Sequence, residues 1–234
     1  MTRAHSDAGL TDELGSPAGM DGIRAGTDSV GAHYALLRRE LVNHVFPAGA
    51  ILLETTLSAR YGVSRTPIRE ALNRLEHDGL LERVVRGYRV RVATPEDIME
   101  LYEARIALES AAAASAALRR TDLDLARLEH LSTQLGSATG ADEVTSVNAE
   151  WHRAIWTAAH NGAIAELLER VMTQMRLFDN GAVGAPDSME RTIKEHAVVL
   201  DALRANDAEG ARSAVAVHLG RTRDLRLAIL AQQR

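Results

Sequence analysis

The chain has 234 residues, 46% hydrophobic and 25% charged, so it is long enough to build one large or two small hydrophobic cores. It contains no cysteine, which excludes disulfide frameworks, thiolate zinc sites and iron–sulfur clusters and fits a reducing cytoplasm. No apolar run approaches the roughly 20 residues of a membrane helix, and the N-terminus lacks the apolar core of a secretory signal, so we expect a cytoplasmic protein without membrane contact.

The net charge of -5 is unevenly distributed. Residues 1–33 carry a charge of -3, residues 34–92 carry +4 and residues 93–234 carry -6. This split predicts a small basic module attached to a larger acidic one. A charge of +4 over such a length also arises by chance, so motifs have to decide between the two interpretations.

The N-terminal stretch differs in periodicity from the rest of the chain. Residues 1–29 are rich in Gly, Ser, Asp and Thr, show no sustained pattern and are predicted to form a disordered tail. Apolar periodicity and breaks then predict three helices: from Tyr34 to the break at Pro47-Ala48-Gly49, near Glu54–Tyr61 before Gly62, and over Arg65–Asp78 before Gly79.

A β-hairpin is predicted after the third helix. Leu81–Val85 and Tyr88–Val92 are apolar segments that flank Arg86-Gly87, which suits a two-residue turn. Helix, helix, turn, helix and hairpin is the order of a winged helix-turn-helix, so we predict that fold for residues 30–93.

Thr94-Pro95-Glu96-Asp97 has the sequence of a helix start, with an N-cap residue, a proline and two acids. We place the domain boundary there. Residues 94–234 are rich in Ala and Leu, and their breaks predict about six helices, hence an all-α bundle. The fold class is therefore mainly α, with a small hairpin as the wing of the first domain.

The third helix has the two faces expected of a recognition helix. Ile68, Leu72 and Leu75 fall on one side, and Thr66, Arg69 and Asn73 on the adjacent side. Arginine and asparagine read guanine and adenine edges in the major groove, and hydroxyls at a helix N-terminus suit phosphate oxygens. Any amphipathic helix has a solvated polar face, and we prefer that interpretation for Asn73 and Arg74.

The segment GVSRTPIREALNRLEHDGLLE, which begins at Gly62, closely resembles the recognition segment of GntR-type transcription regulators. The resemblance implies that Arg65 and Arg69 contact bases, that Ser64 and Thr66 contact phosphates, and that Arg86 and Gly87 at the wing tip enter the minor groove. Upstream, Pro47-Ala48-Gly49 and Leu53 depart from the family pattern, but only in a turn.

Three histidines in the second domain lie on apolar stripes. Asn148 and His152 are four residues apart on one predicted helix, beside Trp151, while His196 and His218 are flanked by apolar residues on two others. A shared metal ion would satisfy three buried imidazoles at once. Each histidine alone is more often an ordinary core or surface residue, so spacing gives only a weak prediction.

Residues 95–232 resemble the FCD effector domain of the FadR subfamily of GntR regulators, through YEARIALE from Tyr102, NAEWH from Asn148, Glu195-His196 and His218. The resemblance implies that Asn148, His152, His196 and His218 bind a divalent metal, zinc first, with nickel or manganese as alternatives, and that a small carboxylate completes the shell. Asn148 stands where Asp is commoner, so the protein ligands leave the ion's charge uncompensated. We therefore expect weak intrinsic metal binding and a strong demand for an anionic effector.

Arg105 is a candidate anchor for that anion, and a salt bridge to a neighbouring helix is the alternative. The alternative for the whole site is a metal-free bundle whose histidines hydrogen-bond to each other and to an organic ligand, as in the acyl-sensing members of the subfamily.

These features predict a ligand-responsive transcription regulator, most simply a repressor of a carbon-metabolism operon. A homodimer would bind a palindromic double-stranded DNA operator and be released by a small carboxylate. The competing class is a metal-dependent hydrolase or isomerase. It needs a general base beside the metal, and Glu150 is two residues from His152 and faces elsewhere, so we predict that the protein is not an enzyme.

Overall fold

The computed structural model describes residues 29–178 and 186–232, and the side chains of residues 30–178 and 189–232. The predicted tail lies outside this part of the chain, except for Ser29, which begins the first helix. Asp187-x-x-Glu190 has the sequence pattern of a helix capping box, and the Asp187 side chain lies outside the described residues. Within the described part, no helix is both long and apolar enough to cross a bilayer.

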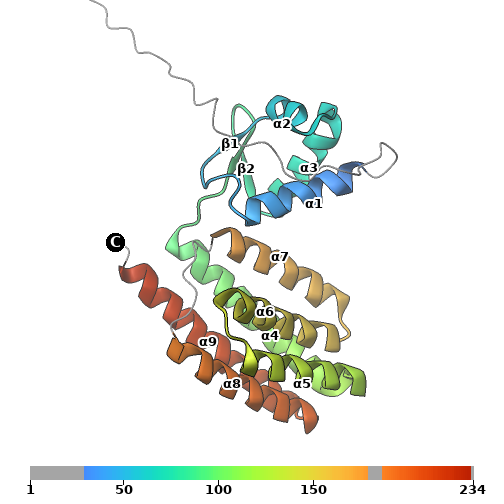
Figure 1. Cartoon of the computed structure of the whole chain (residues 1–234), viewed down its shortest axis with the longest axis vertical. Helices are drawn as coiled ribbons and strands as arrows, with labels where there is room; N and C mark the ends of the chain where they lie inside the picture. The colour runs from blue at the N-terminus through green and yellow to red at the C-terminus, as the bar shows by residue number, and fades with distance from the viewer. Residues whose placement is uncertain (1–28, 179–185, 233–234) are drawn as a thin grey trace, which may run out of the picture.

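The chain forms two helical units, which we call the head, residues 29–93, and the body, residues 94–232 (Figure 1). The head contains, in order, α1 (Ser29–Val42), β1 (Ile51–Leu52), α2 (Glu54–Tyr61), α3 (Arg65–His77), β2 (Leu81–Arg83) and β3 (Tyr88–Val90). The body contains α4 (Pro95–Arg119), α5 (Asp122–Ser137), α6 (Ala141–Ala158), α7 (Gly162–Phe178), α8 (Pro186–Arg204) and α9 (Ala208–Gln232). The predicted class, mainly helical with a small β wing and six body helices, is confirmed for the described residues.

The head packs its helices against one side of a small antiparallel sheet of strand order β1-β3-β2. The fully buried leucines Leu37 and Leu41 of α1 meet Leu72 and Leu75 of α3 in its core. Gly62 ends α2 in the left-handed conformation at φ 66°, which glycine adopts without steric cost. This turn brings α3 across α2, as the sequence predicted.

The wing differs from its prediction by one residue. Arg83 pairs with Tyr88, and Val84 N donates to Gly87 O at 3.2 Å, so the turn is centred on Val85-Arg86 rather than on Arg86-Gly87. Gly87 has φ +91°, and a Cβ there would lie 2.4 Å from the Leu52 carbonyl oxygen of β1. The close approach of β1 therefore requires a glycine at position 87. The sequence of the hairpin alone does not show this requirement.

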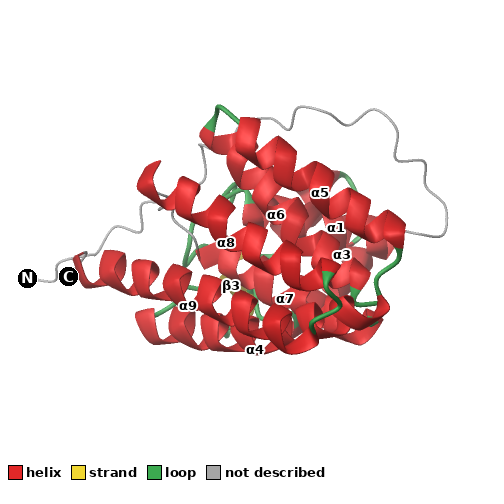
Figure 2. Ribbon diagram, turned by 90° about the horizontal axis from the view of Figure 1, so that it is seen from below, coloured by secondary structure: helices red, strands yellow, loops and turns green. Residues whose placement is uncertain are grey.

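The body is a bundle in which α4 packs along α9 and also contacts α6, α7 and α8 (Figures 1 and 2). The α4 helix starts with the predicted N-cap: Thr94 Oγ1 accepts from Asp97 N at 3.1 Å, and Thr94 N donates to Asp97 Oδ2 at 2.8 Å. Buried alanines such as Ala113 and Ala117 allow the close helix contacts of the core, which surrounds the fully buried Trp151.

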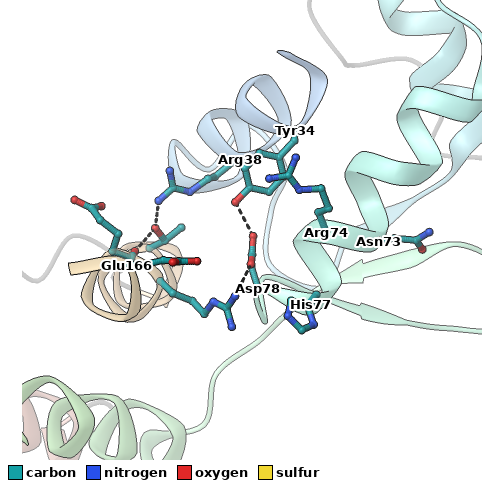
Figure 3. A pocket seen from close by; sticks show the side chains of 10 residues that line it. Tyr34, Arg38, Asn73, Arg74, His77, Asp78 and Glu166 are labelled. Atoms are coloured by element: carbon teal, nitrogen blue, oxygen red, sulfur yellow. Dashed lines mark hydrogen bonds and ion pairs between the residues drawn. The ribbon is translucent and has the colours of Figure 1, made fainter. Parts of the chain in front are cut away.

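Head and body meet at a joint made by the C-terminal half of α7 (Figure 3). Asp78, which follows α3, accepts from Tyr34 Oη at 2.6 Å and lies 3.6 Å from Arg170 Nη2. Gln174 Nε2 donates to the Asp78 carbonyl at 2.7 Å, and Arg38 donates to Thr173. These contacts border a cavity of about 510 Å³.

The apolar packing of the head continues across the joint. Leu177 and Phe178 of α7 and Tyr102 of α4 belong to the same buried cluster as the head core. The guanidinium of Arg91 also lies over the Phe178 ring, 5.4 Å from its centre. The two units are therefore joined by apolar and polar contacts in addition to the chain between them.

Candidate functional site

The N-terminal half of α3 presents outward the side chains that the sequence predicted for DNA. Four of the predicted contact residues are exposed there: Ser64, Arg65, Thr66 and Arg69. The opposite side of the helix supplies buried residues to the head core: Ile68, Ala71, Leu72 and Leu75. The helix thus has a polar face with the residue types that bind phosphates and base edges.

The two arginines of this face differ in their contacts. Arg65 Nη2 donates to Glu54 Oε2 at 3.3 Å, and the Glu54 side chain is only 16% exposed. Arg69 has no hydrogen bond or ion pair within the described part of the chain. Ser64 occupies the N-cap position without a side-chain capping bond, so its hydroxyl stays available.

Asn73 connects the recognition helix to the wing. Its Oδ1 accepts from Tyr88 Oη at 2.5 Å and from Arg83 Nη1 at 3.2 Å. Arg83 Nη1 also donates to Tyr88 Oη at 2.6 Å. Asn73 is exposed, as we expected of a solvated polar face, and it also braces α3 against the hairpin through these bonds.

The wing tip stands beside the N-terminus of α3. Val85 and Arg86 are exposed, and Gly87 is half-buried against β1. A hollow of about 240 Å³ separates the wing from α2 and α3, and Arg65, Arg83 and Arg86 line it. Recognition helix and wing tip therefore present their cations on one side of the head, a shape that suits a duplex groove and its phosphates.

A cluster of buried histidines lies in the body, where three helices meet. His152 comes from α6, His196 from α8 and His218 from α9, and each is at most 4% exposed. One ring nitrogen from each lies within 4.8 Å of the others. The structure thus brings together the three histidines singled out from the sequence.

Two of these rings are hydrogen-bonded to carboxylates through their Nδ1 atoms. Nδ1 of His152 lies 2.7 Å from Glu109 Oε2, and Nδ1 of His218 lies 2.8 Å from Glu195 Oε2. Each ring donates its Nδ1 proton there, which leaves Nε2 as the lone-pair nitrogen that could bind a metal. The sequence motifs contained Glu109 and Glu195, but the chain alone did not show that they face histidines of other helices.

The third ring is held by stacking. His196 lies parallel to Trp151, with ring centroids 3.6 Å apart and planes 6° from parallel. Neither nitrogen of His196 has a hydrogen-bond partner among the described residues, nor do His152 Nε2 and the buried Asn148 Oδ1. Unpartnered buried polar atoms are costly, and the grouped ring nitrogens of His152, His196 and His218 are a donor set that suits a divalent ion such as zinc or nickel.

Burial in the cluster disfavours the protonated form of two of its imidazoles, His196 and His218. Burial lowers the pKa of His196 well below its usual range, and the neighbouring His152 and His218 lower it further. Burial and His152 lower the pKa of His218 to about 4. Burial alone would raise the pKa of Glu109, but His152 and Arg105 outweigh it and lower that pKa. Neutral imidazole is the form that binds metals.

Arg105 is only 7% exposed, and its Nε donates to Glu109 Oε1 at 2.6 Å. The alternative to an anion anchor, a salt bridge, is present, but its partner Glu109 lies one turn further along α4 and not on a neighbouring helix. The predicted role as an anion anchor is compatible with this pairing, since Arg105 also lines a cavity between α4, α7 and α9.

Comparisons with known families cover both units. Residues 31–90 match the family described as bacterial regulatory proteins, gntR family, and residues 100–221 match the FCD domain. The two matches fall on the head and on the body, respectively.

Individual relatives cover most of the chain. An uncharacterised HTH-type transcriptional regulator, YdhC of Bacillus subtilis, is 28% identical over 79% of this chain and 85% of its own length. The Uxu operon regulator of Haemophilus influenzae is 31% identical, covering 79% of this chain and 76% of its own. Among solved structures, E. coli McbR/YncC superposes with a TM-score of 0.70 at 26% identity, over 89% of this chain and 99% of the other.

Proposed function

The chain belongs to the gntR family of bacterial regulatory proteins and carries an FCD domain, and from that premise we propose that it is a metal-assisted, carboxylate-responsive repressor. It is a regulator of transcription, and its family and relatives are not enzymes. The proposal therefore concerns how the head binds DNA and what the body senses.

DNA binding is supported by the exposed face of α3 beside the exposed wing tip. Arg65 and Arg69 are the proposed base-reading residues, because arginine donates two hydrogen bonds to a guanine edge. Ser64, Thr66 and Arg86 would contact the backbone, with Arg86 and Gly87 following the minor groove. Two heads related by a two-fold axis would read a palindrome, so we propose a homodimer.

Repression, as opposed to activation, is the simplest effect of such a head on transcription. A dimer that covers one or two turns of duplex excludes RNA polymerase from an overlapping promoter. Effector binding in the body would then change the position of the heads through α7, which contacts both units at the joint.

The metal is proposed from the grouped ring nitrogens of His152, His196 and His218, with the unpartnered Asn148 Oδ1 as a fourth candidate ligand. A divalent ion held there would supply a Lewis-acidic anchor for an anionic effector. Glu109 and Glu195 orient two of the rings, but their own charges face Arg105 and Arg221. No carboxylate therefore balances the ion among the four ligands, which supports a carboxylate effector and weak metal binding in its absence.

The decisive experiment on the head is a gel shift with the DNA upstream of the protein's own gene. We expect a salt-sensitive, sequence-selective shift at roughly nanomolar protein. Arg65→Ala and Arg69→Ala should abolish it, whereas Arg212→Ala on α9 should not. The absence of any selective shift would contradict the proposed function.

For the body, we propose a calorimetric titration with zinc and with nickel, with and without acetate or succinate. We expect metal binding that strengthens when a carboxylate is present and disappears in His196→Ala. The exposed His130 of α5 gives the matched control, His130→Ala. Equally tight binding without carboxylate would overturn the charge argument, and no binding would favour the metal-free alternative.

A further inference from the structure

The turn that follows the recognition helix is bound by the body. Asp78 and Gly79, which we call the joint turn, lie between α3 and β2 (Figure 3). The backbone N–H of Asp78 donates to Arg74 O at 2.9 Å, so the joint turn continues directly from the last turn of α3. Contacts that fix the joint turn therefore also fix the direction of the helix whose other end carries Arg65 and Arg69.

Two side chains of α7 contact the joint turn from the body. Gln174 Nε2 donates to the Asp78 carbonyl oxygen at 2.7 Å, and Arg170 Nη2 lies 3.6 Å from Asp78 Oδ1. Gly79 has φ +73°, and a Cβ on it would lie 2.6 Å from Gln174 Nε2. The glycine therefore lets α7 approach the backbone at the end of the recognition helix closely.

The first residue after the wing connects the same turn to α4. Arg91 Nη1 donates to Gly79 O at 3.3 Å, and its Nη2 donates to Asp97 Oδ1 at 3.3 Å. Its guanidinium also lies over the Phe178 ring of α7. Residues 91–94 join β3 to α4, so this connection is held at its first residue rather than free along its length.

The Asp78 carboxylate connects the head and the body. It accepts from Tyr34 Oη of α1 at 2.6 Å and faces Arg170 of α7, and the Asp78 side chain is only 19% exposed. A partly buried carboxylate with a charged partner and a hydroxyl partner is held more firmly than a solvated ion pair. The cavity of about 510 Å³ beside these contacts gives the head room to turn on the body once they are lost.

We propose that the joint turn and the side chains that contact it determine which spacing between operator half-sites the protein accepts. Heads fixed on a dimeric body present their recognition helices at one separation and one relative angle. Each base pair added between the half-sites moves them apart by about 3.4 Å and rotates them by roughly 35°. Fixed heads fit one spacing, whereas heads held only by residues 91–94 follow several.

This assignment rests on the proposed function, because it requires a homodimer that binds a palindrome. It adds residues that position α3 and do not themselves touch DNA. It requires neither a metal nor an effector, so the protein and its DNA are sufficient to test it.

The test compares the affinity of the full-length protein for palindromic duplexes that differ only in the number of base pairs between the half-sites. Selection from random duplexes first supplies the half-site, and a duplex with a single half-site serves as the reference. Fluorescence anisotropy at constant salt measures each affinity. Wild-type protein should bind the spacings one base pair shorter and longer than the preferred one about tenfold more weakly, because the protein or the DNA has to deform.

Removal of the contacts from α7 should flatten this preference. Arg170→Ala/Gln174→Ala should bind the neighbouring spacings within about threefold of the preferred one. Its affinity for the single half-site should stay unchanged, because the exposed face of α3 is intact. Arg127→Ala/Gln134→Ala, the same two substitutions at exposed positions of α5, is the matched control.

Substitutions on the head side separate positioning from folding. Asp78→Asn keeps an acceptor for Tyr34 but loses the charge that faces Arg170. Its spacing preference should therefore lie between those of wild type and Asp78→Ala. Arg91→Ala removes the contact with α4, and it replaces the double variant if that protein does not fold, as judged by circular dichroism.

Three results would overturn the assignment. They are equal binding of all spacings by wild-type protein, an unchanged preference in both Arg170→Ala/Gln174→Ala and Arg91→Ala, and an equal loss of affinity for the single half-site. The last result would mean that the contacts serve the fold of the head. An unchanged preference would leave the proposed function standing. Absence of any selective DNA binding by wild-type protein would contradict the proposed function itself, and the assignment would fall with it.

Discussion

The head and the body place their functional side chains in opposite environments. In the head, Arg65 and Arg69 stand in solvent, and only one of them has a partner among the described residues. In the body, His152, His196 and His218 are almost fully buried, and carboxylates or a stacked indole fix their rings. A surface that binds a large partner can keep its donors solvated, whereas a site for a small ligand has to hold its donors in place before the ligand arrives.

Different structural features indicate function in the two regions. In the head, function is inferred from the residues that point outward. In the body it is inferred from atoms that lack a partner although they are buried, because folding tolerates such atoms only for a reason. Substitutions in the two regions should therefore fail in different ways: those in the body should cost stability first, and those in the head should cost DNA binding first.

Of these substitutions, Glu109→Ala should lower the free energy of unfolding of the body the most. It leaves Arg105 buried without its partner and frees the His152 ring, and breaking a buried ion pair costs about 3–5 kcal/mol. Urea unfolding followed by circular dichroism measures this loss. Glu150→Ala, an exposed acid on α6, is the control, and an equal effect of both substitutions would contradict a structural role for the buried pair.

Acid should destabilise the metal-free protein through the body. The pKa of His218 is lowered to about 4 in the folded protein, against 6.5 ordinarily, so folding favours its neutral form. This contribution is complete above about pH 6.5 and is lost as the pH falls toward 4, on the order of 2 kcal/mol by pH 5. Urea titrations of chelated protein at pH 7.5, 6 and 5 test it. His218→Gln should make the profile less steep, with the buried His196 accounting for the slope that remains, and a wild-type profile that is already flat would contradict the prediction.

Arg69→Ala should weaken specific DNA binding by about 1–3 kcal/mol and leave the stability of the fold unchanged within error. The reason is that this side chain is exposed and makes no polar contact within the described part of the head. Fluorescence anisotropy against specific and scrambled duplexes separates the two kinds of binding. A matched loss on both duplexes would identify Arg69 as a backbone contact instead.

Asn73→Ala should have the smallest effect, about 1 kcal/mol of stability, because two hydrogen bonds at the edge of the wing are lost. The expected additional signature is a loss of specific DNA affinity without any loss of a base contact, because the wing is no longer braced. Glu70→Ala, exposed on the same helix, is the control, and identical DNA affinity in both variants would show that the brace does not matter for binding.

Local signals predicted most of the fold. Gly62 and Thr94 marked a helix end and a helix start because caps depend on a few neighbouring residues. The cap at the start of α9 is equally local, since Asp207 Oδ1 accepts from Gly210 N at 2.9 Å. His33 directly follows the predicted tail, and it is a buried residue of α1. The N-terminal turn of that helix has little apolar periodicity, so only tertiary packing reveals it.

The parts of the site that the sequence did not predict depend on contacts between distant segments. The register of β2 against β3 centres the wing turn on Val85-Arg86, and β3 also pairs with the distant β1. The bond between Gln174 and Asp78 spans 96 residues, and the pairing of Glu109 with His152 spans 43. Residue types and spacing within one helix cannot indicate such partners, even when the histidines themselves are recognised.

The stack of Trp151 on His196 also provides an optical probe of this region. The chain has two tryptophans, Trp151 and Trp156, and both lie on α6. Its indole emission therefore originates from one helix, and one of the two emitters touches a candidate ligand ring face to face. A paramagnetic ion such as nickel bound at that ring would quench the emission. Metal occupancy of the histidine cluster could therefore be followed by tryptophan fluorescence, without a label, while the head is bound to DNA.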